Sequence, residues 1–181
     1  MDEKTEGFES WANCSNSALR RATRQLGQLY DDVLAPSGLK ATQYGLLSQI
    51  HFNGNPSLKS LADGLVMDLS ALGHTLKPLI RDGLVGLVPD EKDRRVKRAS
   101  LTEIGVEKWQ EAHLLWREAH SRFDNAFGEE ESAALRNAMN RIASPDFAKK
   151  FVAGPEKDRG TAPKPGSHNP CESFQRLPRF P

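Results

Sequence analysis

The sequence lacks the marks of a membrane protein and of a disulfide-stabilised secreted domain. No run of eighteen apolar residues occurs, and the chain begins Met-Asp-Glu-Lys, without a basic segment leading into an apolar one. We therefore expect neither a membrane span nor a secretory signal, and we expect the protein in the cytoplasm. The two cysteines, Cys14 and Cys171, stand far apart in the sequence, and we interpret both as reduced thiols.

The sequence also lacks a convincing catalytic or metal-binding constellation. His113 and His120 are two turns apart on an expected helix, about 10 Å by helical rise, which is too far to share one metal ion. No Ser/His/Asp set, carboxylate pair or glycine-rich phosphate loop has a suitable context. The acidic run 129–131 is better explained as the first turn of a helix, where it favours the dipole. We expect no enzyme, no metal site and no cofactor.

An excess of charge of one sign is missing from the whole chain but present locally. The formal net charge is +1, which gives no global argument for a nucleic-acid partner. Residues 74–98, however, hold seven basic and four acidic side chains, a local net charge of +3. If DNA is the partner, this segment must supply many of the contacts.

The spacing of apolar residues predicts a mainly α-helical chain with one small β-hairpin. Thr42, Ser57 and Asp68 are expected to cap helices, and Gly83 stands where a left-handed residue would end one. The expected helices cover residues 16–35, 43–52, 58–65, 69–82, 103–127 and 129–143, and the expected strands cover residues 84–89 and 96–101.

The order of these elements is typical of a helix-turn-helix followed by a wing. The second short helix, expected at residues 69–82, carries small and polar side chains near its N-terminus, as do helices that contact base edges in the major groove. The hairpin tip carries arginines, which can enter the narrow minor groove. The competing interpretation is an exposed helix face and a solvated charged turn. The DNA contacts predicted here are Ser70, Ala71, His74, Thr75, Lys77, Arg94, Arg95 and Lys97.

These segments resemble the MarR family of transcription regulators over roughly residues 16–142. The most specific strings are LADGL at 61–65, LKPLIRDGLV at 76–85, PDEKDRR at 89–95 and LTEIG at 101–105. An upstream string, LYDDVLAPSGL at 29–39, resembles the first helix of the family and its end.

The resemblance implies a winged helix-turn-helix homodimer whose N- and C-terminal helices intertwine and which binds a pseudo-palindromic operator. It implies a repressor that releases double-stranded DNA when a small, often phenolic, ligand or an oxidant acts. Asp93 and Arg95 resemble the wing motif of the family, in which the carboxylate orients an arginine. Asp93 therefore joins the predicted DNA-binding set.

The domain organisation follows from the same resemblance. We expect a flexible N-terminal arm at 1–9, a MarR-type domain at 10–153 and a disordered tail at 154–181. The tail holds six prolines and three glycines in 28 residues. Within the domain, the winged helix-turn-helix spans 55–102, and the dimerisation helices span about 10–36 and 120–150.

Aromatic side chains could line a pocket for an aromatic effector between the dimer helices and the winged domain. The candidates are Trp11, Tyr44, Trp109 and Trp116, and Arg20 is a candidate anchor for a carboxylate. The alternative is that each aromatic residue belongs to the core or to the dimer interface, and that Arg20 lies on a helix surface.

Cys14 offers a second mode of control. A redox-sensing thiol must be exposed and have a lowered pKa, and the nearest arginines are six and seven positions away. Cys14 is therefore either a sensor or an inert thiol. The sequence as a whole predicts a DNA-binding transcription regulator, with a winged-helix protein-interaction module as the alternative.

Overall fold

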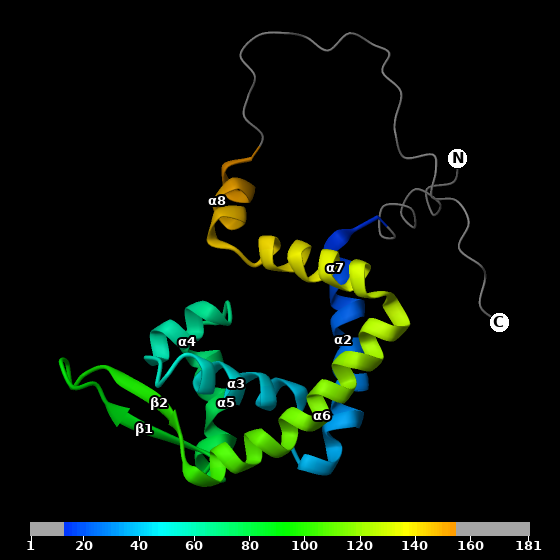
Figure 1. Ribbon diagram of the computed structural model, residues 1–181. Coiled ribbons are helices and arrows are strands. Elements are labelled where there is room, and N and C mark those ends of the chain that lie inside the picture. The colour runs from blue at the N-terminus through cyan, green and yellow to red at the C-terminus, as the bar shows by residue number, and fades with distance from the viewer. Residues whose placement is uncertain (1–12, 155–181) are drawn as a thin grey trace, which may run out of the picture. The chain divides into compact units, whose positions relative to one another are not determined.

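The computed structural model describes residues 13–154 (Figure 1). These residues fall into two units. The first unit reaches Arg141 and the second begins at Ile142. None of the helices in this part of the chain is long and apolar enough to cross a membrane. Trp11 and Cys171, singled out from the sequence, lie outside the described residues.

The first unit begins with two helices joined by a tight connection. α2 (Ser15–Leu34) is followed by a short 3-10 helix (Ala35–Ser37) and by α3 (Ala41–Phe52). Gly38 ends the 3-10 helix at a φ of 72°, a left-handed conformation that glycine adopts without strain. The first helix was expected at residues 16–35, and α2 matches this expectation to within one residue at each end.

The predicted cap of α3 is wrong, because Thr42 lies inside the helix and Lys40 is the N-cap residue. Two side chains, one from α3 itself and one from α2, accept hydrogen bonds from the free backbone N–H groups at this end. The Gln43 carboxamide oxygen accepts from Lys40 at 2.8 Å, and the Asp31 carboxylate accepts from Ala41 at 2.7 Å. The helix can therefore begin earlier than a hydroxyl cap would place it.

The helix-turn-helix consists of α4 (Leu58–Gly64) and α5 (Leu69–Arg81). Both predicted N-caps are confirmed, since Ser57 Oγ and Asp68 Oδ1 accept first-turn backbone N–H groups at 3.1 and 2.7 Å. Gly83 has a φ of 71° just after α5, as predicted for a terminating glycine.

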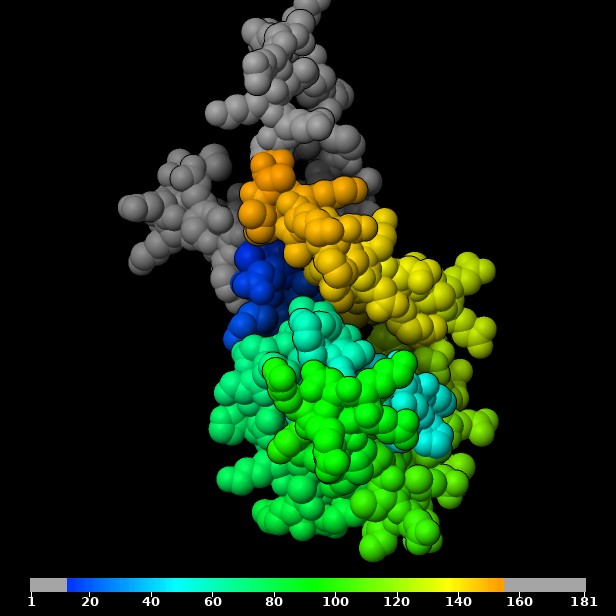
Figure 2. Space-filling view, turned by 90° about the vertical axis from the view of Figure 1, so that its left-hand side faces the viewer, coloured from blue at the N-terminus to red at the C-terminus, as the bar shows by residue number. Residues whose placement is uncertain are grey.

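The wing (residues 85–101) is an antiparallel pair, β1 (Val85–Pro89) and β2 (Lys97–Leu101). The second edge of β2 is occupied as well, because the Ala99 N–H donates to the Pro56 carbonyl at 3.0 Å. The wing is therefore joined to the turn that begins α4. In the space-filling view, the wing and the α4–α5 pair form one continuous face (Figure 2).

Two further helices complete the first unit, α6 (Glu103–Phe127) and α7 (Glu129–Ile142), of which only Ile142 falls in the second unit. Thr102 fixes the start of α6. Its hydroxyl accepts from the Gly105 N–H at 3.0 Å and donates to the Gly83 carbonyl at 2.6 Å. The end of α5, the wing and the start of α6 are thereby tied together.

The second unit contains a helix that the sequence reasoning missed, α8 (Pro145–Ala153). The sequence predicts no helix after the one expected at residues 129–143. Ser144 Oγ accepts from the Phe147 N–H at 3.2 Å, and proline fits the first helical position because it has no N–H to leave unpaired.

One apolar core joins the helix-turn-helix, the wing and the long helices. Its members come from the end of α2, from α3, α4 and α5, from both wing strands and from the first half of α6. The most completely buried side chains of this core include Leu34, Leu47, Leu72 and Leu79. Because α5 buries its leucines here, its opposite face is presented to solvent.

Candidate nucleic-acid interface

α5 presents a row of side chains one helical turn apart. Ser70, His74 and Lys77 are exposed, while Ala71 and Thr75 are half-buried beside them. The Thr75 hydroxyl donates to the Ala71 carbonyl at 3.1 Å, so it is already engaged within the helix. All five residues predicted from the sequence therefore lie on or beside one face of α5.

The wing tip carries two exposed arginines, Arg94 and Arg95, here called the tip arginines, with Lys97 exposed at the start of β2. Asp93 Oδ1 accepts from the backbone N–H of Arg95 at 3.0 Å. The resemblance implies a carboxylate that orients an arginine. In this wing, the contact between Asp93 and Arg95 is this hydrogen bond to the Arg95 backbone.

The ion pair of the wing joins two residues that the sequence reasoning did not select, Asp90 and Arg98. Arg98 Nε contacts Asp90 Oδ2 across the base of the turn. This guanidinium, followed by backbone N–H groups of the turn, lowers the pKa of Asp90 to about 2. The only sequence signal was an aspartate at the start of the turn and an arginine in the second strand.

The remaining basic side chains of this face are free to meet a partner. Among residues 13–154, the ion pairs of α4, α5 and the wing are Lys59 with Asp63, Arg81 with Asp82 and Arg98 with Asp90. The hydrogen bond from Arg81 also lowers the pKa of Asp82, so that pair stays ionised. The unneutralised cations are Lys77, Lys92, Arg94, Arg95 and Lys97.

A second feature is a ladder of stacked rings along α6, formed by Trp109, His113, Trp116 and His120 (the ring ladder). Successive centroids lie 5.0, 5.7 and 4.9 Å apart, with interplanar angles of 25°, 16° and 12°. His51 of α3 stacks on Trp109 at 3.9 Å.

Two hydrogen bonds anchor the ring ladder to α3. The Tyr44 hydroxyl lies 2.8 Å from His113 Nδ1, and Trp109 Nε1 donates to Ser48 Oγ at 3.0 Å. Burial raises the pKa of Tyr44, which keeps this hydroxyl protonated. The structure thus brings together three of the predicted ligand residues, Tyr44, Trp109 and Trp116.

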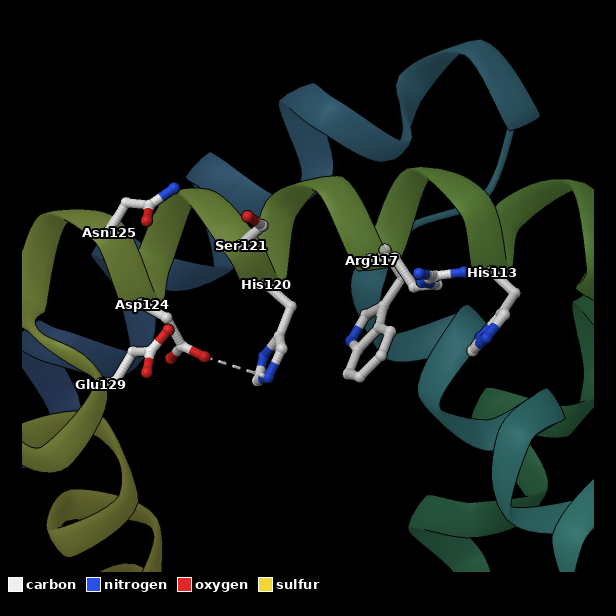
Figure 3. A pocket seen from close by; sticks show the side chains of 8 residues that line it. His113, Arg117, His120, Ser121, Asp124, Asn125 and Glu129 are labelled. Carbon is white, nitrogen blue, oxygen red and sulfur yellow. Dashed lines mark ion pairs between the residues drawn. The ribbon is translucent and has the colours of Figure 1, made fainter.

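A hollow of about 440 Å³ opens beside the outer half of the ring ladder. Figure 3 shows His113, His120 and Asp124 projecting from the same side of α6, with Glu129 beyond them. His120 Nε2 lies 3.4 Å from Asp124, which also pairs with Arg136 at 3.0 Å. The hydrogen bond from Arg136 is the first cause of the lowered pKa of Asp124.

Of the predicted ligand residues that the structure describes, Trp116 alone lines this hollow; Tyr44 and Trp109 are buried in the core, and Arg20 is exposed on α2. The sequence reasoning missed Arg117 and the two histidines as lining residues. The available signal was the spacing of the two histidines, which stand three residues before and four residues after Trp116. Within residues 13–154, no group of three potential ligands could hold a metal ion.

Cys14 is the N-cap residue of α2 and is half-buried. Hydrogen bonds, first from the Ser17 backbone and then from its side chain, lower the pKa of the thiol. This meets one requirement for a reactive cysteine, although no arginine supplies the effect.

Comparisons with solved structures identify relatives of this arrangement. The transcriptional regulator MosR of M. tuberculosis, solved in complex with DNA, has 32% identity and a TM-score of 0.68, over 76% of this chain and 99% of MosR. A mutant of MarR from E. coli, solved with operator DNA, has 23% identity and a TM-score of 0.64, over 70% and 91% of the two chains. PcaV from Streptomyces coelicolor, solved with its natural ligand, has 18% identity and a TM-score of 0.66, over 75% and 95%.

The comparison with family models adds a match of residues 39–97 to the MarR family, whereas the search of curated proteins gives no match. The matched residues run from the connection before α3 to the wing. The likeness to E. coli MarR and to PcaV shows the fold alone. The identity with MosR extends over nearly all of that regulator, and this chain therefore belongs to the MarR family of transcription regulators.

Proposed function

We propose that this chain is a sequence-specific, homodimeric DNA-binding repressor that acts in the cytoplasm and has no catalytic role. The observation that carries the proposal is the continuous face formed by α5 and the wing, with its unneutralised cations. α5 would lie in the major groove, where Ser70 and His74 meet base edges and Lys77 meets phosphate. The tip arginines would enter the minor groove, with Lys97 on the backbone beside it. MosR and E. coli MarR were both solved with DNA.

We assign DNA binding and dimerisation to different segments of the chain. Residues 55–102 would form the DNA-binding unit. The segments at about 10–36 and 120–150, of which residues 10–12 lie outside the described part of the chain, would form the dimer. Apolar side chains are available for that contact, since Leu29 of α2 and Phe127 of α6 are 50% and 48% exposed. An apolar hollow of about 420 Å³ also opens between α2, α6 and α7. A dimer would present two copies of α5 about 34 Å apart, one turn of DNA.

We place the effector site at the hollow beside the ring ladder. Trp116 lines this hollow with its indole ring, and Arg117 and His113 offer donors for a carboxylate, which favours an aromatic acid. PcaV was solved with a natural ligand. A ligand that wedges against α6 would change the spacing of the two DNA-binding units and so release the operator.

A second route of release is oxidation of Cys14, favoured by the lowered pKa of its thiol. A Cys14→Ser variant separates the two routes. If oxidation releases DNA, this variant stays bound in peroxide but still responds to an aromatic acid.

Fluorescence anisotropy with the promoter fragment upstream of its own gene tests the DNA-binding proposal. We expect the logarithm of the binding constant to fall linearly with the logarithm of salt concentration, with a slope of about −0.9 for each phosphate contacted. Arg94→Ala and Arg95→Ala should each weaken binding by about tenfold.

The matched control is Lys108→Ala on α6, whose side chain pairs with Glu111 away from the proposed face. It should bind as the wild type does. Binding without a salt slope, or tip variants that behave like the control, would favour a protein-interaction module instead.

A further inference from the structure

The Asp90 carboxylate uses both of its oxygens to organise the wing turn. Oδ1 accepts from the backbone N–H groups of Lys92 and Asp93 at 2.8 and 3.0 Å. Oδ2 pairs with Arg98 Nε from the opposite strand. Only 14% of the Asp90 side chain remains exposed. This one carboxylate therefore holds the turn that displays the tip arginines.

Arg98 makes a second contact outside the wing. Its Nη1 donates to the Asn55 carbonyl at 2.9 Å, in the turn that precedes α4. The neighbouring backbone follows the same path, through the Ala99–Pro56 hydrogen bond and the bridge between Arg98 and Ser57. Ser57 is the N-cap of α4, so these contacts connect the wing turn with the first residue of the helix-turn-helix.

The contacts of Arg98 differ from those of the tip arginines. Its guanidinium already donates to a carboxylate and to a carbonyl, whereas the side chains of Arg94 and Arg95 have no such partner within the described residues. With the Asp90 pKa at about 2, the Asp90–Arg98 pair stays ionised at any pH at which DNA binding is measured. Arg98 is thus held in place before DNA arrives.

We propose that Arg98 is a positioning residue, which through Asp90 and Asn55 locks the wing tip to the start of α4 and so sets the reach of the tip arginines relative to α5. The inference rests on the proposed DNA binding. A wing locked in this way loses little conformational freedom when it docks, and this preorganisation strengthens binding without any new contact. Arg98 needs no contact with DNA to act.

A double-mutant cycle with the full-length protein and the promoter fragment tests the role. Arg98→Met removes the guanidinium and keeps much of the side-chain length. We expect it to weaken binding by about tenfold, equivalent to about 1.4 kcal/mol. In a background that carries Arg94→Ala and Arg95→Ala, the same substitution should weaken binding by less than about twofold, because the groups it positions are gone.

Two further variants separate positioning from charge. Arg98→Lys keeps the positive charge but cannot span Asp90 and Asn55 at once, so it should bind as weakly as Arg98→Met. Asp90→Asn should bind DNA as weakly as these two variants, since it removes the carboxylate partner of the same ion pair. Lys108→Met, which breaks an ion pair on α6, is the matched control and should bind normally.

Amide hydrogen exchange in the absence of DNA supplies a readout that does not depend on binding. The Lys92, Asp93 and Arg95 amides should exchange at least about tenfold faster in Arg98→Met, while the protected amides of α5 and α6 keep their rates. Additive losses in the cycle, rescue of affinity by lysine, or unchanged exchange at the turn would each overturn the positioning role. A wild-type protein that binds no DNA would refute the proposed function, and the exchange rates would still decide whether Arg98 locks the wing.

Discussion

Replacing Gly105 with alanine should destabilise the protein, although the same change inside a helix ordinarily stabilises it. Gly105 lies in the first turn of α6, against the backbone that leads into β1. A Cβ atom at this position would lie 2.0 Å from the Leu84 carbonyl oxygen and 2.9 Å from its carbon. Both are backbone atoms, so no side-chain rotation can relieve the overlap.

The cost follows from what must move. To restore an ordinary contact, α6 and the Leu84 backbone must separate by more than about 1 Å, an overpacking cost of about 1–3 kcal/mol. The same separation lengthens the bond from Thr102 N to the Leu84 oxygen, now 3.1 Å, and the bond from Thr102 Oγ1 to Gly83, now 2.6 Å. These two bonds contribute about 1 kcal/mol each. Alanine returns about 1 kcal/mol of helix propensity, which leaves a net loss of about 2–4 kcal/mol.

Urea unfolding followed by circular dichroism measures this loss, with all variants at one protein concentration because a dimer couples stability to concentration. The matched control is Gly45→Ala in α3, where no heavy atom lies within 4 Å of the new Cβ. The free energy of unfolding of this control should rise by about 0.5–1 kcal/mol. If Gly105→Ala is as stable as the wild type, or shifts in the same direction as Gly45→Ala, the close approach of α6 to Leu84 is refuted.

Three further predictions follow from other contacts. Asp68→Ala should lower the free energy of unfolding by about 1 kcal/mol because it removes the cap of α5, and Asp68→Ser should restore most of that loss in the same urea assay. Tyr44→Phe should cost about 1 kcal/mol, since His113 Nδ1 loses its partner at 2.8 Å, and an unchanged unfolding midpoint would contradict this. The Asp90 pKa of about 2 is below its ordinary 3.8, so the stabilisation of the wing is complete above pH 3.8 and is lost as the pH falls through about 2. Exchange at the wing turn should rise over that range, and in Asp90→Asn this pH dependence should disappear.

The sequence was sufficient for several features that depend on residues a few positions apart. Ser57 and Asp68 could be identified as caps because a cap bonds a backbone N–H in the next turn. Gly83 could be placed because a helix end of this kind needs a left-handed residue. Thr42 misled for the same local reason, since the groups that accept at the start of α3 include Asp31, ten positions away.

The ring ladder could not be predicted, because periodicity shows which face of a helix is buried but not which residues meet there. The sequence reasoning considered His113 and His120 only as metal ligands. It considered each tryptophan by itself, as a residue that could line a ligand pocket. In the structure each of these histidines stacks on Trp116, and His113 meets Tyr44 across 69 positions of sequence. The Asp90–Arg98 pair was missed in the same way, since it depends on the register of the hairpin.

The position of α6 determines how an effector could act on the wing. The helix is capped by Thr102, which is bonded to Gly83 just after α5, and the ring ladder begins at Trp109, two turns further on. The wing is tied to α4 through Arg98 and to α6 through Thr102, so these elements should move together as one rigid body.

A ligand at the ring ladder should therefore release DNA by shifting this body as a whole, with the wing still folded. An aromatic acid that weakens DNA binding should leave amide exchange at residues 90–98 unchanged and alter it in α3 and α6 around Tyr44 and Trp116. Faster exchange at the wing turn on addition of the acid would instead mean that release proceeds by loosening the wing.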